Sequence, residues 1–310
     1  MYKKMADQII YFSGGGFFRR VVLALLALTS FYSLCSIAQA ELIQVTRYDD
    51  ADDYLPSAEK RNKNNIRLLL KQQEGEEIFK VASPRNVMIG VVAKVPTDSD
   101  AAVVMLLGGN GVLSIVNNKL DRSFSFQPRT RDYWWSQKFA TFVVDAPSDR
   151  LGKDGIQDAK WRSGSEHRTD LKAVLDEIGK RFTGPIVIFG HSNGAISLGN
   201  LASLANSKVK VYLISSAAHF KPNTEILREV EYKAPVVFFE HTKDTCPESR
   251  SKEAEQLFNA LKAQMKRLFW VDGGSDPISG PCGPFTHHSY FGIEKATIDR
   301  MAAEIRTALK

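Results

Sequence analysis

The stretch 184–198 constrains the fold of this 310-residue chain more than any other part of it. Within it, the run Ile186–Phe189 is β-branched or aromatic and lies between Pro185 and Gly190, which is typical of a strand buried on both faces. After Gly194 the apolar residues recur at helical spacing. The pattern therefore predicts a strand, a tight Gly-x-Ser-x-Gly turn and a helix.

The serine of this turn is Ser192. On so sharp a turn, a serine hydroxyl is pushed out of the sheet and lies beside helix N-terminal amides that can hold a developing negative charge. The flanking glycines leave room for the adjacent strand and helix, where a Cβ would collide. Chance also produces this short pattern, so the alternative is a plain strand-to-helix turn in which Ser192 caps the helix.

Secondary structure alternates along the rest of the chain. We expect strands at 77–81, 87–95, 101–107, 139–144, 209–214, 235–240 and 267–271, and helices at 61–71, 112–120, 166–181, 253–266 and 293–309. This alternation indicates one α/β domain over residues 41–310 with a mainly parallel sheet, and the strands before Val103 are expected at its edge. Only residues 215–233 separate the strands expected at 209–214 and 235–240, so we expect no large cap domain between them.

Residues 1–40 have the organisation of a secretory signal peptide. A basic region ends at Arg19–Arg20, the apolar run Val21–Leu28 follows, and Ala38–Gln39–Ala40 supplies a small-x-small cleavage site. A membrane helix is the alternative, but polar residues interrupt the segment and a cleavage signature ends it. We expect cleavage and a periplasmic or secreted protein with no stable membrane span; the choice between general and twin-arginine export stays open.

The charge of the chain excludes few classes of function, but it argues against nucleic-acid binding. The formal net charge is +6, and the segment 1–40 contributes half of it, with four basic residues and one acidic residue. The remaining excess of basic residues is too small to favour binding to nucleic acid or to a membrane surface.

Cleavage after residue 40 would remove Cys35 and leave Cys246 and Cys282. Two cysteines in an oxidising compartment are expected to form a disulfide, and two unrelated buried thiols are the alternative.

Four segments between Met88 and Lys310 resemble the α/β-hydrolase superfamily, and in particular exported bacterial serine esterases. The segment 190–194 (Gly-His-Ser-Asn-Gly) matches the nucleophile elbow, and 108–111 (Gly-Gly-Asn-Gly) matches the oxyanion loop. The segment 236–244 is similar to the strand and turn that deliver the catalytic acid, and 282–290 lies where the superfamily places its histidine. The resemblance implies an α/β-hydrolase fold with a mostly parallel central sheet flanked by helices.

The resemblance also implies a role for individual residues. The roles are Ser192 as nucleophile, Asp244 as acid, His288 as base, and the backbone amides of Asn193 and of Gly109 or Asn110 as oxyanion donors. A disulfide between Cys246 and Cys282 would tie the acid loop to the base loop.

Some of these roles have rivals. Glu240 is a second acid, but it lies at the strand end and is expected to point sideways. We favour His288 over His287 because Ser289 and Tyr290 supply the small residue and the aromatic residue that usually follow the catalytic histidine in this superfamily.

Three other histidines are assigned structural roles. His191 and His241 are expected to be structural residues or to lie at the rim of the site, and His167 with Arg162 to order the loop that follows Asp145. Trp134, Trp135 and Trp161 are either core residues or the lining of an acyl pocket.

The function implied is hydrolysis of a small carboxylic ester or thioester through an acyl-enzyme, in a site that is open or covered by the loop 145–165. The alternatives are a peptidase or acyltransferase with the same residues, and a non-catalytic periplasmic binding module. A nicotinamide-dependent enzyme is disfavoured because no Gly-x-Gly-x-x-Gly follows a first strand. We expect no cofactor and no metal site; the sequence leaves the oligomeric state open.

Overall fold

The computed structural model describes residues 40–44, 73–113, 115–117, 119–120 and 124–310. Residues Ala40–Lys310 form one compact unit. The predicted signal peptide, apart from Ala40, and the predicted helix 61–71 lie outside the described residues. No helix among those described is both long enough and apolar enough to cross a membrane.

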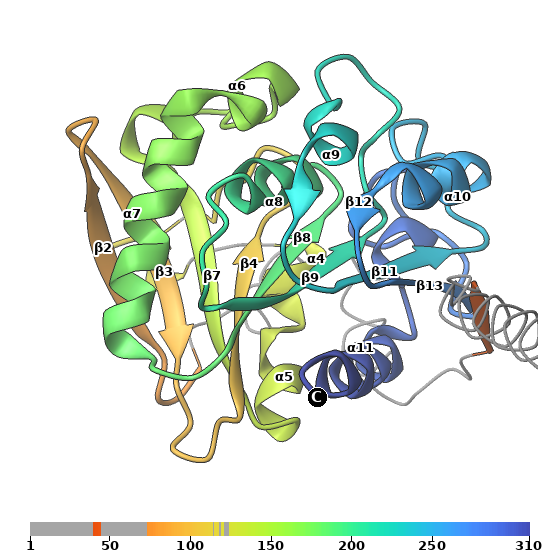
Figure 1. Ribbon diagram of the computed structural model, residues 1–310, viewed down its shortest axis with the longest axis horizontal. Helices are drawn as coiled ribbons and strands as arrows, with labels where there is room; N and C mark the ends of the chain where they lie inside the picture. The colour runs from red at the N-terminus through yellow and green to blue at the C-terminus, as the bar shows by residue number, and fades with distance from the viewer. Residues whose placement is uncertain (1–39, 45–72, 114, 118, 121–123) are drawn as a thin grey trace, which may run out of the picture. The chain divides into compact units, whose positions relative to one another are not determined.

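A nine-stranded sheet forms the centre of the described chain (Figure 1). From one edge to the other its strands are β1 (Glu41–Gln44), β13 (Lys266–Asp272), β11 (Val236–His241), β9 (Val209–Ser215), β8 (Ile186–His191), β4 (Ala101–Leu106), β7 (Phe139–Pro147), β3 (Val87–Lys94) and β2 (Glu77–Ser83). All neighbouring pairs are parallel except β2 with β3 and β3 with β7. The prediction of a mainly parallel sheet with its antiparallel strands at an edge is confirmed.

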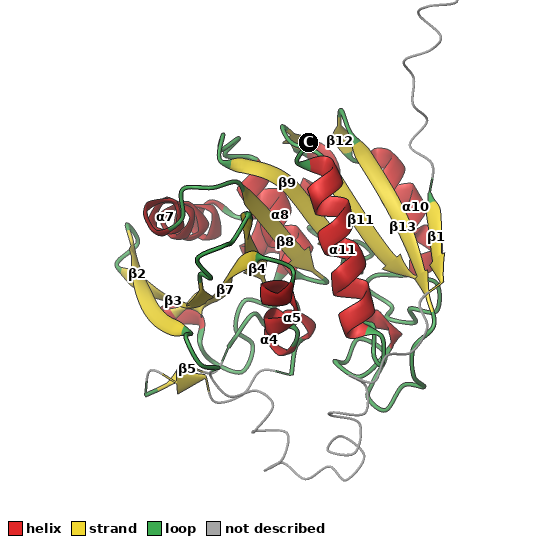
Figure 2. Ribbon diagram, turned by 90° about the horizontal axis from the view of Figure 1, so that it is seen from below, coloured by secondary structure: helices red, strands yellow, loops and turns green. Residues whose placement is uncertain are grey.

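Helices cover both faces of this sheet (Figure 2). One face carries α7 (Ser165–Arg181), α8 (Gly194–Ala202) and α10 (Ser251–Ala260), and the other carries α4 (Phe126–Arg129), α5 (Arg131–Ser136) and α11 (Glu294–Ala308). The shorter elements are α6 (Ala159–Ser163), α9 (Ile226–Glu229), the 3₁₀ turns η1 (Ser148–Arg150) and η2 (His287–Ser289), and the strand pairs β5 (Ile115–Val116) with β6 (Lys119–Leu120) and β10 (Glu231–Tyr232) with β12 (Lys262–Ala263).

The central strands are long apolar runs because side chains from both helical layers bury them. Every residue of β4, β7, β8 and β11 is buried. Residues of α11, among them Ile298 and Met301, pack in one core cluster with Phe189 of β8 and Trp134 of α5. Burial on both faces explains why these strands lack the alternation of polar and apolar residues.

Two predicted helices differ from the structure. Ile115–Val116 and Lys119–Leu120 pair as the antiparallel strands β5 and β6 instead of a helix. β-Branched residues at 112, 115 and 116 favour extended backbone, and Asn117 takes a positive φ of 50° after β5. The helix predicted over 253–266 ends at Ala260, since Lys262–Ala263 pairs with Glu231–Tyr232 as a strand.

Candidate active site

The turn after β8 places Ser192 in the left-handed region, with φ 54°. The backbone N–H of Ser192 donates to the carbonyl of Ser215 on the neighbouring strand, and α8 begins two residues later. A Cβ at Gly194 would lie 1.8 Å from the Leu106 carbonyl oxygen, and one at Gly190 would lie 2.6 Å from the Gly194 oxygen. Both glycines are therefore required by the close approach of strand, turn and helix.

The loop Gly108–Gly111 follows β4 and lies directly against this turn. A Cβ at Gly108 would lie 3.0 Å from the Cβ of Ser192, and Gly109 has a φ of 54°. Within the described residues, the backbone N–H groups of Gly109, Asn110 and Asn193 donate to no protein acceptor. These amides are free to donate to an oxygen of a bound molecule.

Asp244 follows β11 and contacts His288. Its Oδ2 lies 2.8 Å from Nδ1 of His288 and accepts a hydrogen bond from the Ser249 hydroxyl at 2.6 Å. Its Oδ1 accepts the backbone N–H of Cys246 at 2.8 Å. Asp244 and His288 are both buried. These donors come from two loops, the acid loop (residues 242–250, after β11) and the histidine loop (residues 273–293, after β13). The two loops approach each other at the same end of the sheet.

The hydrogen bonds keep Asp244 ionised. Burial raises the pKa of Asp244, but the charge of His288 and the three hydrogen bonds outweigh that effect and lower the pKa below its ordinary value. An ionised carboxylate on Nδ1 leaves Nε2 as the ring nitrogen of His288 that can accept a proton. Sequence reasoning missed Ser249, because a serine five residues beyond an acid has no recognisable pattern.

Glu240 and His287, the alternatives to Asp244 and His288, make different contacts. His287 is half-buried and stacks on His241, with ring centroids 4.7 Å apart. Glu240 is fully buried, and burial together with the negative charge of Asp244 raises its pKa well above the ordinary value. No hydrogen bond joins Glu240 to His288 in the part of the chain that the structure describes.

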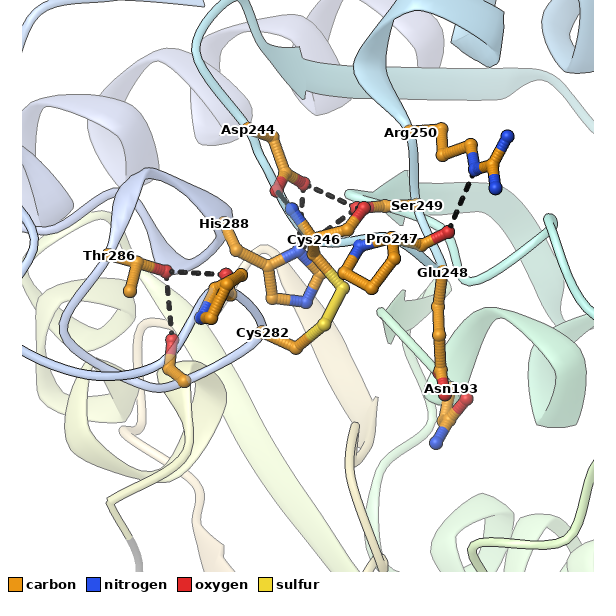
Figure 3. Close-up of a disulfide and its surroundings, with 12 residues drawn as sticks. Asn193, Asp244, Cys246, Pro247, Glu248, Ser249, Arg250, Cys282, Thr286 and His288 are labelled. Atoms are coloured by element: carbon orange, nitrogen blue, oxygen red, sulfur yellow. Dashed lines mark hydrogen bonds and ion pairs between the residues drawn. A yellow bond between two sulfur atoms is a disulfide. The ribbon is translucent and has the colours of Figure 1, made fainter.

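A disulfide joins Cys246 and Cys282, with their Cα atoms 4.6 Å apart (Figure 3). Cys246 lies two residues after Asp244, and Cys282 lies six residues before His288. The predicted link between the acid loop and the histidine loop is present.

Ser192 and His288 line one cavity of about 450 Å³. Its other described lining residues are Gly108, Gly109, Val112, Phe124, Ser125, Phe126, His191, Cys282, Pro284 and Ser289. The Ser192 hydroxyl forms no hydrogen bond with His288 within the described residues; such contacts are often loose in a protein without substrate. None of these lining residues comes from the loop 145–165 or is a tryptophan.

The tryptophans instead support the fold. Trp134 is fully buried in the core cluster, and Trp161 packs on His167 with ring centroids 4.6 Å apart. The Nε2 of His167 lies 2.8 Å from the Ser197 hydroxyl, and the Nδ1 of His191 lies 2.8 Å from that of Ser215. Burial lowers the pKa values of both histidines well below the ordinary value, so their rings are neutral.

No group of three or more histidine, cysteine or acidic residues in the described chain has an arrangement that could hold a metal ion. The described site contains a serine, a histidine paired with a buried carboxylate, and backbone amides that donate to no described protein acceptor, all beside one cavity.

No protein-family model matches the sequence, and no curated protein matches it. The structure is similar to a dienelactone hydrolase from Anabaena variabilis, with a TM-score of 0.55 and 14% identity over 76% of this chain and 100% of that one. It is similar to the esterase Pf2001 from Pyrococcus furiosus, with a TM-score of 0.55 and 13% identity over 76% and 93%. An α/β serine hydrolase homologue from Coxiella burnetii gives a TM-score of 0.52 and 15% identity over 76% and 99%.

At these identities the similarity concerns the fold. The protein has the α/β-hydrolase fold, as the sequence motifs predicted.

Proposed function

We propose that the protein is a serine hydrolase that cleaves a carboxylic ester or thioester through an acyl-enzyme. The observation that carries the proposal is the 2.8 Å contact between Nδ1 of His288 and Oδ2 of Asp244 at the wall of the cavity that Ser192 also lines. In this proposal Ser192 is the nucleophile, His288 the general base and Asp244 the carboxylate that fixes the tautomer of the imidazole.

The reaction follows from these positions. His288 Nε2 accepts the proton of Ser192 while Oγ attacks the substrate carbonyl, and the N–H of Asn193 with that of Gly109 or Asn110 stabilises the oxyanion. As the tetrahedral intermediate collapses, His288 returns the proton to the leaving alkoxide or thiolate and the acyl group stays on Ser192. A water molecule then gives a proton to His288 and attacks the acyl carbon. As the acyl–Oγ bond breaks, His288 returns that proton to Oγ of Ser192, and the acid leaves.

The cavity favours an uncharged acyl group. Val112, Phe124, Phe126 and Pro284 give it an apolar and aromatic wall, and its described lining contains no lysine, arginine or acidic residue. A volume of about 450 Å³ suits a short or aromatic acyl group. The names of the similar structures, which include an esterase and a dienelactone hydrolase, support carboxylic esters as the substrate class.

A fluorophosphonate probe tests the proposal, because it reacts only with an activated serine. We expect stoichiometric labelling of the parent at Ser192 and no labelling of Ser192→Ala. Ser203→Ala is the matched control, since Ser203 follows the same helix at its far end and its hydroxyl donates to the Asn200 carbonyl. A parent that stays unlabelled, or labelling that persists in Ser192→Ala, contradicts the proposal.

A panel of short esters, long-chain esters, thioesters and peptide amides then separates esterase activity from peptidase activity, and added alcohol acceptors detect acyl transfer.

We also propose that residues 1–40 are a cleaved signal peptide and that the protein acts in the periplasm or outside the cell. The Cys246–Cys282 disulfide supports an oxidising compartment. N-terminal sequencing of protein from the periplasmic and extracellular fractions should find Glu41 as the first residue, and a full-length chain that begins at Met1 in the cytoplasm contradicts this.

A further inference from the structure

Arg162 is a buried cation that pairs with no carboxylate among the described residues. Its side chain is fully buried on the short helix α6. It donates to three neutral oxygens, which are the carbonyl of Ile156 at 2.7 Å, the hydroxyl of Ser197 at 2.7 Å and the carbonyl of Gly109 at 3.0 Å. No carboxylate among the described residues forms an ion pair with it. Two other arginines with little exposed surface are paired, Arg129 with Glu294 and Arg131 with Glu76.

An uncompensated buried charge is costly, so its position requires an explanation. Burial lowers the pKa of Arg162 to about 9, which leaves the guanidinium charged at neutral pH. The neighbouring His167 supplies no negative charge, because an imidazole is either neutral or positive, and burial lowers its pKa well below the ordinary value and keeps this ring neutral. The charge therefore lies in the protein without a permanent counter-charge.

One residue of the oxyanion loop separates this charge from the cavity. Gly109 lines the cavity, and its carbonyl oxygen accepts both from Arg162 and from the side-chain amide of Asn193, at 3.1 Å. A Cβ at Gly111 would lie 2.5 Å from Cγ1 of Ile156 and 3.1 Å from Nη2 of Arg162. The loop is thus packed directly on the guanidinium.

The contact with Gly109 acts on the amides of the same loop. The peptide group between Gly109 and Asn110 is trans, so its N–H points away from the oxygen that Arg162 contacts. A hydrogen bond on the oxygen of a peptide group polarises that group and strengthens its N–H as a donor. A positive charge behind the loop also lowers the energy of a negative charge in front of it.

We propose that Arg162 is a positioning residue for the oxyanion: it fixes and polarises the Gly108–Gly111 loop, and the negative charge that forms on the substrate in the transition state is the counter-charge it lacks at rest. The inference rests on the proposed serine hydrolase function and adds a residue that acts through Gly109 without contact with the substrate.

Two pairs of variants test this proposal, with the rate of fluorophosphonate inactivation and the kcat and KM for a short ester as readouts. Arg162→Lys keeps the charge, and Arg162→Gln keeps a donor for the Gly109 carbonyl but removes the charge. We expect Arg162→Gln to lower kcat and the inactivation rate about 30- to 100-fold with KM changed less than about threefold, and Arg162→Lys to lose at most about tenfold. Arg181→Gln is the control, because Arg181 is exposed at the end of α7, donates to Glu177 and Glu77 and should keep the parent rates.

The second pair leaves Arg162 in place. Ser197→Asp puts a carboxylate beside Nη1 of Arg162, and Ser197→Asn has the same size without the charge. We expect the aspartate variant to react about tenfold more slowly than the asparagine variant. If Arg162→Gln does not fold, this comparison still tests whether the charge of Arg162 affects the reaction rate.

Equal rates within either pair overturn the role of the charge, provided that the parent is labelled at Ser192. A parent without labelling overturns the proposed function instead, so the two failures are distinguishable.

Discussion

Cys246 donates its backbone N–H to Oδ1 of Asp244 at 2.8 Å, so the residue that forms the disulfide also holds the carboxylate paired with His288. The disulfide therefore fixes the acid loop at the residue where its position matters for the imidazole. Loss of the disulfide should affect both stability and activity.

The first prediction concerns this disulfide. The bridge closes a sequence separation of 36 residues, so Cys246→Ser combined with Cys282→Ser should lower the free energy of unfolding by about 3–4 kcal/mol in the chain-entropy model. Ester hydrolysis should fall with it, because the Asp244 loop loses its covalent anchor. Denaturant unfolding without reductant, with the parent plus and minus reductant as the control, measures the change. Two freely alkylatable thiols in the unreduced parent would show that the bridge does not form.

The two adjacent histidines provide the second prediction. His288→Ala should lower kcat for a short ester at least about 10⁴-fold, because it removes the proposed general base. His287→Ala should stay within about tenfold of the parent, because His287 stacks on His241 and no hydrogen bond joins its side chain to Asp244 among the described residues. Steady-state kinetics with both variants checks this. A larger loss in His287→Ala than in His288→Ala would reverse the assignment.

The third prediction concerns the glycine after Ser192. Gly194→Ala would place a Cβ 1.8 Å from the Leu106 carbonyl oxygen, so we expect a loss of about 3 kcal/mol or more in stability, or failure to fold. Gly152→Ala is the control, since a Cβ there meets nothing within 4 Å and should change stability by less than about 0.5 kcal/mol. Thermal unfolding of the two variants measures the difference. A Gly194→Ala protein as stable as the control contradicts the geometry.

The fourth prediction concerns the pH dependence of stability at Asp145. Burial raises the pKa of Asp145 to about 6, although its Oδ1 accepts the N–H groups of Leu113 and Ala146. The folded state then binds more protons than the unfolded state between the ordinary carboxyl pKa and pH 6. This group's contribution to stability is present at low pH and is lost as pH rises through about 6.

Asp145→Asn removes this titration and keeps an oxygen that can accept both N–H groups. Between pH 4 and pH 7 the stability of the parent relative to Asp145→Asn should therefore fall by about 1–3 kcal/mol. Urea unfolding at several pH values measures it. A constant difference between the two proteins over this range contradicts the prediction.

Much of the fold could be predicted because its signals are local. The apolar runs of β4, β8 and β11 and the helical periodicity of α7 and α11 depend on residues close in sequence. The strand β1 had no such signal, because it forms by pairing in parallel with β13, more than 220 residues further along the chain.

The sequence by itself determined the turn around Ser192. A strand, a sharp turn and a helix approach so closely here that positions 190 and 194 must be glycine. This steric requirement is local, because it involves only the five consecutive residues 190–194. Only the tertiary structure decided that Nδ1 of His288 rather than His287 meets Asp244, that Ser249 supports the carboxylate, and that Arg162 lies uncompensated behind Gly109. These contacts join loops from separate strands, and hydrogen bonds and burial depend on distances in space that no local pattern of residues specifies.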